Sequence, residues 1–415
     1  MKRIIILLLV LLLLFSAQAC DSSNNVAHAD ELTASVTAQE LDTVEPTAEQ
    51  SAAALGFGLS LLREDFSDGN ALLSPMSLLL ALGMTSNGAV GQTREQMEAV
   101  LGMDVDTLNT YLSSYLTLLP QNNSFSSAGK LNAANSVWVR EGLTVQDAFL
   151  QAAVNYYDAQ VFSAPFDKST VSDINRWVSL HTDGMIDRLL DSVPNDSAMY
   201  LLNAIAFDAD WQDVYYNTNV MDAAFTTEDG TNRTVSMMYT SERRYFETEL
   251  ATGFLKYYNA KRYAFAALLP NKGITISELL DSLDGQTLYD VLSAPIDIRV
   301  DTGLPKFSYE AQTDAKESLR ALGMTDAFDP DSADFSGISR SGNLFISRVL
   351  HKAYIAVDEK GTRAGAATAA EVAAGATPTP EEFKTVILDR PFVYLILDTK
   401  YTTPVFLGVL MDPGE

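Results

Sequence analysis

Hydrophobic residues recur at helical spacing through the first half of the chain. From Thr47 onward the apolar positions fit one face of a helix, until the turn residues 68–70 interrupt them. Short apolar runs at 135–139 and 200–207 are typical of buried strands. The same helical spacing predicts further helices at 75–87, 92–101, 105–119, 145–157 and 171–181. The first half is therefore predicted to be mainly helical, with inserted strands.

The pattern changes after Trp211, where β-branched and aromatic residues form short runs bounded by turn residues. Two helices are still expected, at 276–283 and 311–322. The predicted strands are 263–269, 296–300, 306–309, 344–357, 386–388 and a final hairpin of 392–397 with 405–411. Clustered helices followed by clustered strands predict an α+β fold with large antiparallel or mixed sheets.

The first twenty residues have the pattern of an export signal. Lys2 and Arg3 precede an unbroken apolar run at 4–15, and small residues follow up to Cys20. This segment resembles a bacterial lipoprotein signal, in which the cysteine is acylated and becomes the new N-terminus. An ordinary cleaved signal is the alternative.

We therefore expect three parts in the chain: a signal peptide at 1–19, a lipidated acidic tether at 20–46 and one domain at 47–413. The tether region is polar, acidic and free of aromatic residues, which is typical of a solvated linker. The expected location is the cell surface or envelope, with the protein anchored to the membrane through Cys20, or alternatively secreted.

Composition narrows the classes of function. The chain is 47% hydrophobic and 20% charged, and its net charge of -26 disfavours nucleic-acid binding. One cysteine cannot form a disulfide within the chain, and three histidines leave little for a protein metal site. We expect no metal and no cofactor.

Common catalytic motifs are absent from the sequence. There is no G-x-S-x-G, Walker A, G-x-G-x-x-G, H-E-x-x-H or C-x-x-C pattern. The 54 acidic residues offer many accidental carboxylate pairs, so a glycosidase-like pair stays open. The absence of these motifs does not by itself exclude an enzyme.

Residues 361–377 form the most unusual segment of the chain. Its charges, Arg363 and Glu371, lie eight residues apart, so an extended strand would present both on one face. The opposite face, which includes Thr362 and Val372, is small and uncharged throughout. Such a face could enter the interior of a sheet without burying a charge, although a flexible surface loop is the plainer interpretation.

The residues on both sides of this segment resemble the serpin family. Residues 357–367 (VDEKGTRAGAA) are similar to the hinge of that family, and 388–396 (LDRPFVYLI) to its C-terminal signature. Further regions are similar to the serpin family and occur in the same order as in that family. They are 70–96, which contains Ser74-Pro75-Met76-Ser77; 203–211, which contains Asn-Ala-Ile-Ala-Phe and Trp211; and the two short segments 334–338 and 351–353. The resemblance covers about residues 47–413.

The resemblance implies helices clustered around three β-sheets and an exposed reactive-centre loop at about 359–390. It also implies a suicide mechanism. A serine protease attacks the loop and forms an acyl-enzyme, and the loop then inserts into the five-stranded central sheet and carries the protease with it. The protein would be a monomer and a single-use inhibitor, and it would not be an enzyme.

The resemblance assigns roles to three groups of residues. The hinge would consist of Glu359, Gly361, Thr362, Ala364, Ala366, Ala367 and Thr368. The shutter, a polar cluster under the sheet where the strands part, would consist of Ser74, Ser77, Asn203 and His351. The breach, where the loop enters, would consist of Trp211, Lys306 and Glu359.

Counting along the loop in the family register places the reactive bond at Gly375-Ala376, with Ala374 and Thr377 as neighbouring candidates. No Lys or Arg lies between Ala364 and Phe383, which disfavours a trypsin-like protease. We expect an elastase-like or subtilisin-like partner that accepts small residues. Two alternatives remain open: a non-inhibitory serpin acting as a surface binding protein, and a lipid-anchored surface enzyme or glycan-binding protein.

Overall fold

The computed structural model describes residues 28–119, 130–182, 184, 186–194, 197–341, 343–362 and 382–414. Several predicted site residues lie outside this part of the chain, namely Cys20, Ala364, Ala366, Ala367, Thr368, Ala374, Gly375, Ala376 and Thr377.

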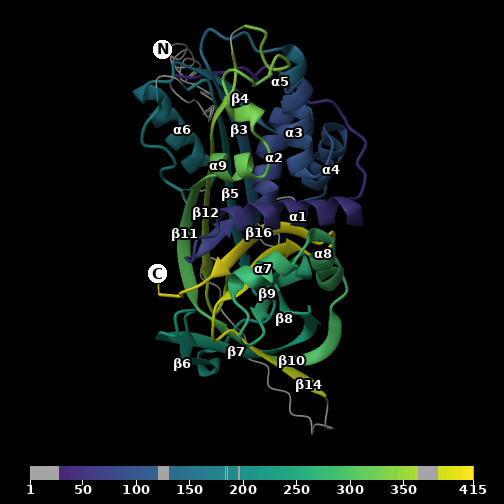
Figure 1. Ribbon diagram of the computed structural model, residues 1–415, viewed down its shortest axis with the longest axis vertical. Helices are drawn as coiled ribbons and strands as arrows, with labels where there is room; N and C mark the ends of the chain where they lie inside the picture. The colour runs from purple at the N-terminus through teal and green to yellow at the C-terminus, as the bar shows by residue number, and fades with distance from the viewer. Residues whose placement is uncertain are drawn as a thin grey trace, which may run out of the picture.

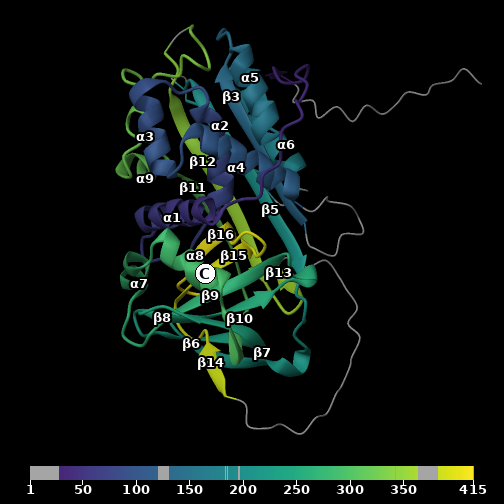
Figure 2. The same cartoon turned by 90° about the vertical axis from the view of Figure 1, so that its right-hand side faces the viewer.

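Seven described strands form the central sheet, which runs along the long axis of the molecule (Figure 2). Their order is β1-β4-β3-β5-β13-β12-β11, so five longer strands are joined by a two-residue edge strand and a two-residue strand inside the sheet. The bounds are β1 Asp30–Glu31, β3 Lys130–Arg140, β4 Gln160–Ala164, β5 Met199–Asp210, β11 Phe307–Asp314, β12 Ile346–Val357 and β13 Gly361–Thr362.

The second sheet has nine strands and fills the lower part of the molecule in Figure 1. Its order is β14-β10-β7-β8-β9-β15-β16-β2, with β6 paired to β7. The bounds are β2 Ala71–Leu73, β6 Val220–Thr226, β7 Asn232–Glu247, β8 Ala251–Tyr257, β9 Tyr263–Pro270, β10 Ile296–Pro305, β14 Phe383–Ile387, β15 Phe392–Asp398 and β16 Thr403–Leu410.

The long strand β7 explains why two sheets stand where we expected three. It spans 16 residues, pairs with β6 over its first part and with β8 over its last four residues, 244–247. Two of the expected sheets are therefore continuous through one strand. The α+β fold itself is as expected.

Most of the helices gather around the upper end of the central sheet, whereas α7 and α8 lie lower, beside the nine-stranded sheet (Figure 1). Polar caps fix where they begin: Thr47 and Gln50 form a capping box before α1, and Ser74 caps α2, whose first residue is Pro75. The bounds are α1 Ala48–Asp65, α2 Pro75–Ser86, α3 Gly91–Leu101, α4 Val105–Leu118, α5 Asp147–Tyr157, α6 Lys168–His181, α7 Ile276–Ser282, α8 Gly285–Ser293 and α9 Lys316–Ala321.

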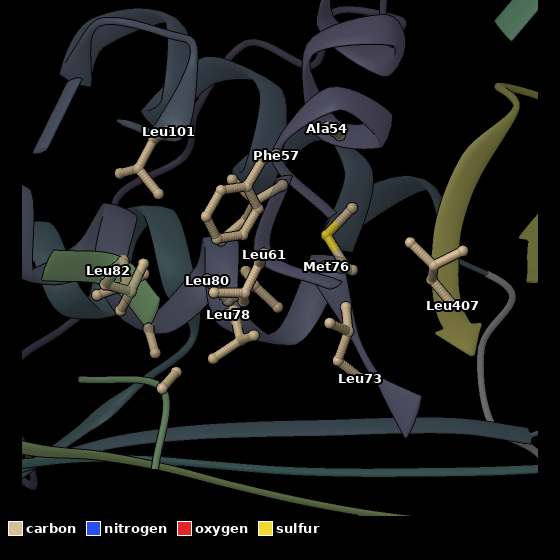
Figure 3. Close-up of a cluster of buried hydrophobic side chains, with 14 of the residues drawn as sticks. Ala54, Phe57, Leu61, Leu73, Met76, Leu78, Leu80, Leu82, Leu101 and Leu407 are labelled. Carbon is tan, nitrogen blue, oxygen red and sulfur yellow. The ribbon is translucent and has the colours of Figure 1, made fainter. Parts of the chain in front are cut away.

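Helix α2 lies in the middle of the main hydrophobic core. All twelve of its residues are buried, and Figure 3 shows Met76, Leu78 and Leu80 close to Phe57 of α1 and Leu407 of β16. Its hydroxyl groups are buried as well, and those of Thr85 and Ser86 donate to carbonyls of the preceding turn. Helix α2 thus packs against β3 and β5 of the central sheet and against β16 of the second sheet.

The two faces of the central sheet pack against different partners. Ile205 and Phe207 of β5 face a cluster shared with the nine-stranded sheet, whereas Leu202 faces Trp177 of α6. This alternation follows from the period of two in a strand. One face of β5 is thus interior, and the other lies under α6 or toward solvent.

Two expectations about the elements were wrong. Residues 311–314 belong to strand β11 and not to a helix, because they pair with β12 from Ala311 opposite Ala353 to Asp314 opposite Leu350. The helix in that region, α9, starts at Lys316. Helix α8 and the strands β2 and β4 were not anticipated.

The segment 28–46, expected as a solvated tether, instead lies against the body. Strand β1 pairs with the edge strand β4, and the Leu32 amide donates to the Val161 carbonyl at 2.8 Å. Farther along, the Val44 amide donates to the Ser114 hydroxyl at 3.0 Å. These bonds use backbone groups, which every sequence carries, so side-chain composition did not reveal them. Within the described chain, no helix is long and apolar enough to cross a membrane.

Candidate functional site

The candidate site is the place where strands β5 and β12 separate. They pair in parallel from Ile346 opposite Met199 up to Lys352 opposite Ala204. Beyond that point β13 lies between them, antiparallel to both. The direct ladder therefore ends halfway along the two strands, and the hinge occupies the far end of the opening.

A tight turn at Asp358 leads into β13. The Asp358 amide donates to the Gly361 carbonyl at 3.0 Å, and the Asp358 carboxylate accepts from the amides of Lys360 and Gly361 at 2.8 and 3.2 Å. A side chain at Gly361 would collide with the carbonyl of Ala209 on β5. Gly361 is thus required for close approach of two backbones.

Thr362 is buried in the sheet, with 2% of its surface exposed. It pairs with Ala209 of β5 and Val357 of β12, so its side chain shares their interior face. Its hydroxyl forms a short hydrogen bond with the Tyr258 hydroxyl. The hinge threonine therefore already occupies an inward-facing position with its polar atom satisfied.

Trp211 donates two hydrogen bonds to the turn at Asp358. Its indole Nε1 donates to the Asp358 carbonyl at 2.8 Å and its backbone amide to the Lys360 carbonyl at 2.6 Å. The indole stacks on the Tyr258 ring with centroids 4.4 Å apart. The tryptophan and the hinge are thereby joined through backbone atoms, which constrain position without depending on the loop side chains.

Lys306 and Glu359 form the predicted ion pair, with Nζ and Oε1 2.8 Å apart. Burial alone would raise the pKa of Glu359, but the hydrogen bond and charge of Lys306 outweigh it and leave the pKa below its ordinary value. Both side chains are partly exposed, so the pair is screened by solvent.

A second, buried ion pair beneath the hinge was not anticipated. Lys256 has 1% of its surface exposed, and its Nζ lies 2.8 Å from Glu242 and 4.4 Å from the Tyr215 ring centroid. Burial raises the pKa of Glu242 despite the lysine. Tyr215 in turn donates its amide to the Glu359 carbonyl at 2.9 Å. In the sequence, the feature that could have indicated this pair is a lysine inside the apolar run at 253–258.

The predicted shutter residues meet under the sheet at the point where the direct ladder ends. The Ser74 amide donates to His351 Nε2 at 3.0 Å, and the Ser77 hydroxyl donates to the Asn203 amide oxygen. His351 and Asn203 are cross-strand neighbours on β12 and β5. Asn135 of β3 accepts from the Asn203 side chain and extends the cluster.

Burial keeps His351 neutral. With 1% of its surface exposed, the pKa of the imidazole is lowered to about 4 by desolvation. Because Nε2 accepts from Ser74, the proton of the neutral ring resides on Nδ1. In the part of the chain that the structure describes, no three acidic, His or Cys side chains gather as a metal would require.

Comparisons with known proteins agree with this geometry. A family model described as "Serpin (serine protease inhibitor)" matches residues 51–413. An uncharacterised serpin-like protein of Thermococcus kodakarensis is 29% identical over 352 residues, which cover 84% of this chain and 82% of the relative. Glia-derived nexin of Rattus norvegicus is 32% identical over 356 residues, covering 83% and 88%.

Solved structures are similar over nearly the whole chain. The thermophilic serpin tengpin in its native state gives a TM-score of 0.87 at 40% identity, covering 93% of this chain and 100% of that one. The latent state of tengpin gives 0.75 at 39% identity, covering 91% and 100%. Human thyroxine-binding globulin in complex with thyroxine gives 0.78 at 27% identity, covering 89% and 99%. At almost equal identity, the arrangement of this chain is closer to the native state of tengpin than to the latent one.

Proposed function

The chain belongs to the serpin family, and we propose that it inhibits serine proteases by inserting its cleaved loop between β5 and β12. The observation that carries this proposal is the hinge itself. Gly361 is paired with β5, Thr362 is paired with both β5 and β12, and Thr362 is buried with a satisfied hydroxyl. Insertion would continue a strand that has already begun.

The length of β5 fits the length of the loop. Continuing the register of β13 along β5 would place residue 372 opposite Met199, where β5 begins. Twelve residues at about 3.3 Å each span about 40 Å. Gly375 of the proposed bond Gly375-Ala376 comes three residues after this stretch, so the acylated end would reach the far end of the sheet.

Continued in the same register, an inserted strand would bring Thr368 between Asn203 and His351. These two residues are direct neighbours now, and an inserted strand would separate them. A small residue with a hydroxyl suits this position, because the cluster contains buried polar groups that need partners. The shutter would then exchange one set of hydrogen bonds for another during insertion.

We further propose an elastase-like or subtilisin-like target and a lipid anchor at Cys20. The small residues around the candidate bond support an elastase-like or subtilisin-like target.

The apolar run and the small residues before Cys20 support the lipid anchor. Replacement of Cys20 by serine should release the protein from membrane fractions, and unchanged membrane association would contradict lipidation.

Incubation with a pancreatic-type elastase tests the inhibitory function. We expect a covalent complex that survives denaturing electrophoresis. The released C-terminal peptide should have the mass of a fragment that begins at Ala376. Gly375→Arg should redirect the inhibitor toward trypsin, and Lys360→Arg, within the hinge but away from the candidate bond, serves as the control. Complete cleavage without any complex, with elastase and with subtilisin, would contradict inhibition and favour a surface binding protein.

A further inference from the structure

Three successive carbonyls of the hinge turn, 358–360, accept hydrogen bonds from the segment 211–215 that follows β5. Trp211 donates its indole Nε1 to the first carbonyl at 2.8 Å and its amide to the third at 2.6 Å. The Tyr215 amide donates to the second carbonyl at 2.9 Å. The position of the turn therefore depends on the position of this one short segment.

The segment 211–215 has no regular structure that would fix its shape. Trp211 forms an isolated β-bridge with Tyr258, and the four residues after it belong to no helix or strand. Such a stretch has no repeating hydrogen bonds of its own, so contacts with neighbouring elements must hold it in place.

Lys256 of β8 supplies such contacts. Its Nζ donates to the Asp213 carbonyl at 3.0 Å and lies 4.4 Å from the ring centroid of Tyr215 and 5.4 Å from that of Trp211. One ammonium group thus contacts three residues of the segment, including both residues that donate to the turn. Resting on the proposed function, we infer that Lys256 is a positioning residue, which fixes the segment 211–215 and so keeps the hinge turn where loop insertion would begin.

Glu242 of β7 allows this ammonium to be buried. Lys256 has 1% of its surface exposed, and its Nζ lies 2.8 Å from Glu242 Oε1. A buried ammonium without a counter-charge is strongly disfavoured. Glu242 and the Asp213 carbonyl use two of its three N–H donors, and the two aromatic rings stabilise the charge further. The pair therefore joins β7, β8 and the segment after β5 at one point.

Stability alone does not require a charge at this position. Apolar side chains of similar volume in place of a buried ion pair often leave the free energy of unfolding unchanged or raise it. Such side chains could not donate to the Asp213 carbonyl or attract the two rings as an ammonium does. Replacing the pair by apolar residues should therefore release the segment while the fold stays stable, which separates positioning from stability.

The test variant is Lys256→Met with Glu242→Leu in the full chain, which removes both charges and leaves neither unpaired. The matched control is Arg233→Met with Asp412→Leu. It removes an ion pair near the start of the same strand β7, where Nε and Oδ2 are 2.9 Å apart. A second variant, Lys256→Gln with Glu242→Gln, keeps polar side chains in case the apolar pair packs poorly.

Amide hydrogen exchange of the intact protein tests the positioning without any protease. In both Lys256 variants, the amides of Trp211 and Tyr215 should exchange at least tenfold faster than in the wild type and in the control. Amides of the buried strand β15 should exchange at the wild-type rate, because the fold is intact. Unchanged exchange at Trp211 and Tyr215 would overturn the inference.

The yield of covalent complex tests the consequence for the proposed function. Insertion competes with completion of proteolysis, so a displaced hinge turn should raise the ratio of cleaved inhibitor to covalent complex at least threefold with elastase. The unfolding midpoint should stay within a few degrees of the wild type, and the control should keep the wild-type ratio. An unchanged ratio in the Lys256 variants, with a wild type that does form the complex, would also overturn the inference. Absence of any complex with the wild type would instead contradict the proposed function, and hydrogen exchange would still decide whether Lys256 fixes the segment.

Discussion

At the residue scale, the surroundings of each breach and hinge side chain determine how much it contributes to stability. Lys306 and Lys256 both pair with a glutamate at 2.8 Å, yet the first pair is partly exposed and the second lysine is buried. The sequence indicated the polar residues of the hinge and shutter through their order along the chain. It did not indicate Lys256 or Tyr258, because their roles depend on neighbours from distant strands.

Replacing Lys306 and replacing Lys256 should therefore have different effects on the free energy of unfolding. Lys306→Ala should change the free energy of unfolding by less than about 1 kcal/mol, since exposed ion pairs contribute little. Lys256→Ala should destabilise by about 3–5 kcal/mol because it leaves Glu242 unpaired in a buried site. Denaturant midpoints measured under one protocol compare the two, and equal losses would contradict this assignment.

Thr362→Arg should convert the protein from an inhibitor into a substrate. The position faces the interior of the sheet with 2% of its surface exposed, and a guanidinium there would be buried without a partner. Cleavage by elastase should continue, while the yield of covalent complex on a denaturing gel falls at least tenfold. Thr362→Ser keeps the hydroxyl and serves as the control. An unchanged yield with arginine would argue against insertion.

His351 should make stability depend on pH. Its native pKa of about 4 lies below the ordinary value near 6.5, so the unfolded chain binds a proton first as the pH falls. This contribution to stability is complete above about pH 6.5 and is lost as the pH falls toward 4. Between pH 7.5 and 5.0 the loss is about 2 kcal/mol.

Comparison of the wild type with His351→Asn isolates this contribution from the many carboxylates. Asparagine can accept from the Ser74 amide but does not titrate. The difference between the two proteins in denaturant midpoint should shrink on going from pH 7.5 to 5.0. A difference that is the same at both pH values would contradict a neutral buried histidine.

At the element scale, local pattern was sufficient where one face of an element meets the core. The amphipathic helices and the final hairpin follow their hydrophobic spacing closely. Residues 311–314 were misassigned because a strand with one solvent-facing side and small residues has no strong period. The two-residue strands β1 and β13 carry no pattern of their own, since pairing with a neighbouring strand creates them.

The packed N-terminal segment should contribute to stability. Removal of residues 1–46 exposes the edge of β4 and removes several backbone hydrogen bonds, whereas removal of residues 1–27 leaves both in place. Thermal unfolding at a fixed scan rate should give a midpoint several degrees lower for the longer deletion. Equal midpoints would mean that the segment is the solvated tether suggested by its composition.

At the scale of the whole molecule, the two-residue strand β13 lies between β5 and β12, beyond the point where these two strands pair directly. The described arrangement resembles the native state of tengpin more than its latent state. Completion of the strand would add backbone hydrogen bonds along both β5 and β12 and bury the small residues of the loop. The intact fold would then have a lower stability than the same chain after cleavage.

Thermal unfolding of the intact and the loop-cleaved protein measures this difference directly. Insertion between β5 and β12 predicts that a single cut in the loop raises the unfolding midpoint by tens of degrees, and that the gain is abolished in Thr362→Arg. An equal or lower midpoint for the cleaved wild-type protein would contradict loop insertion.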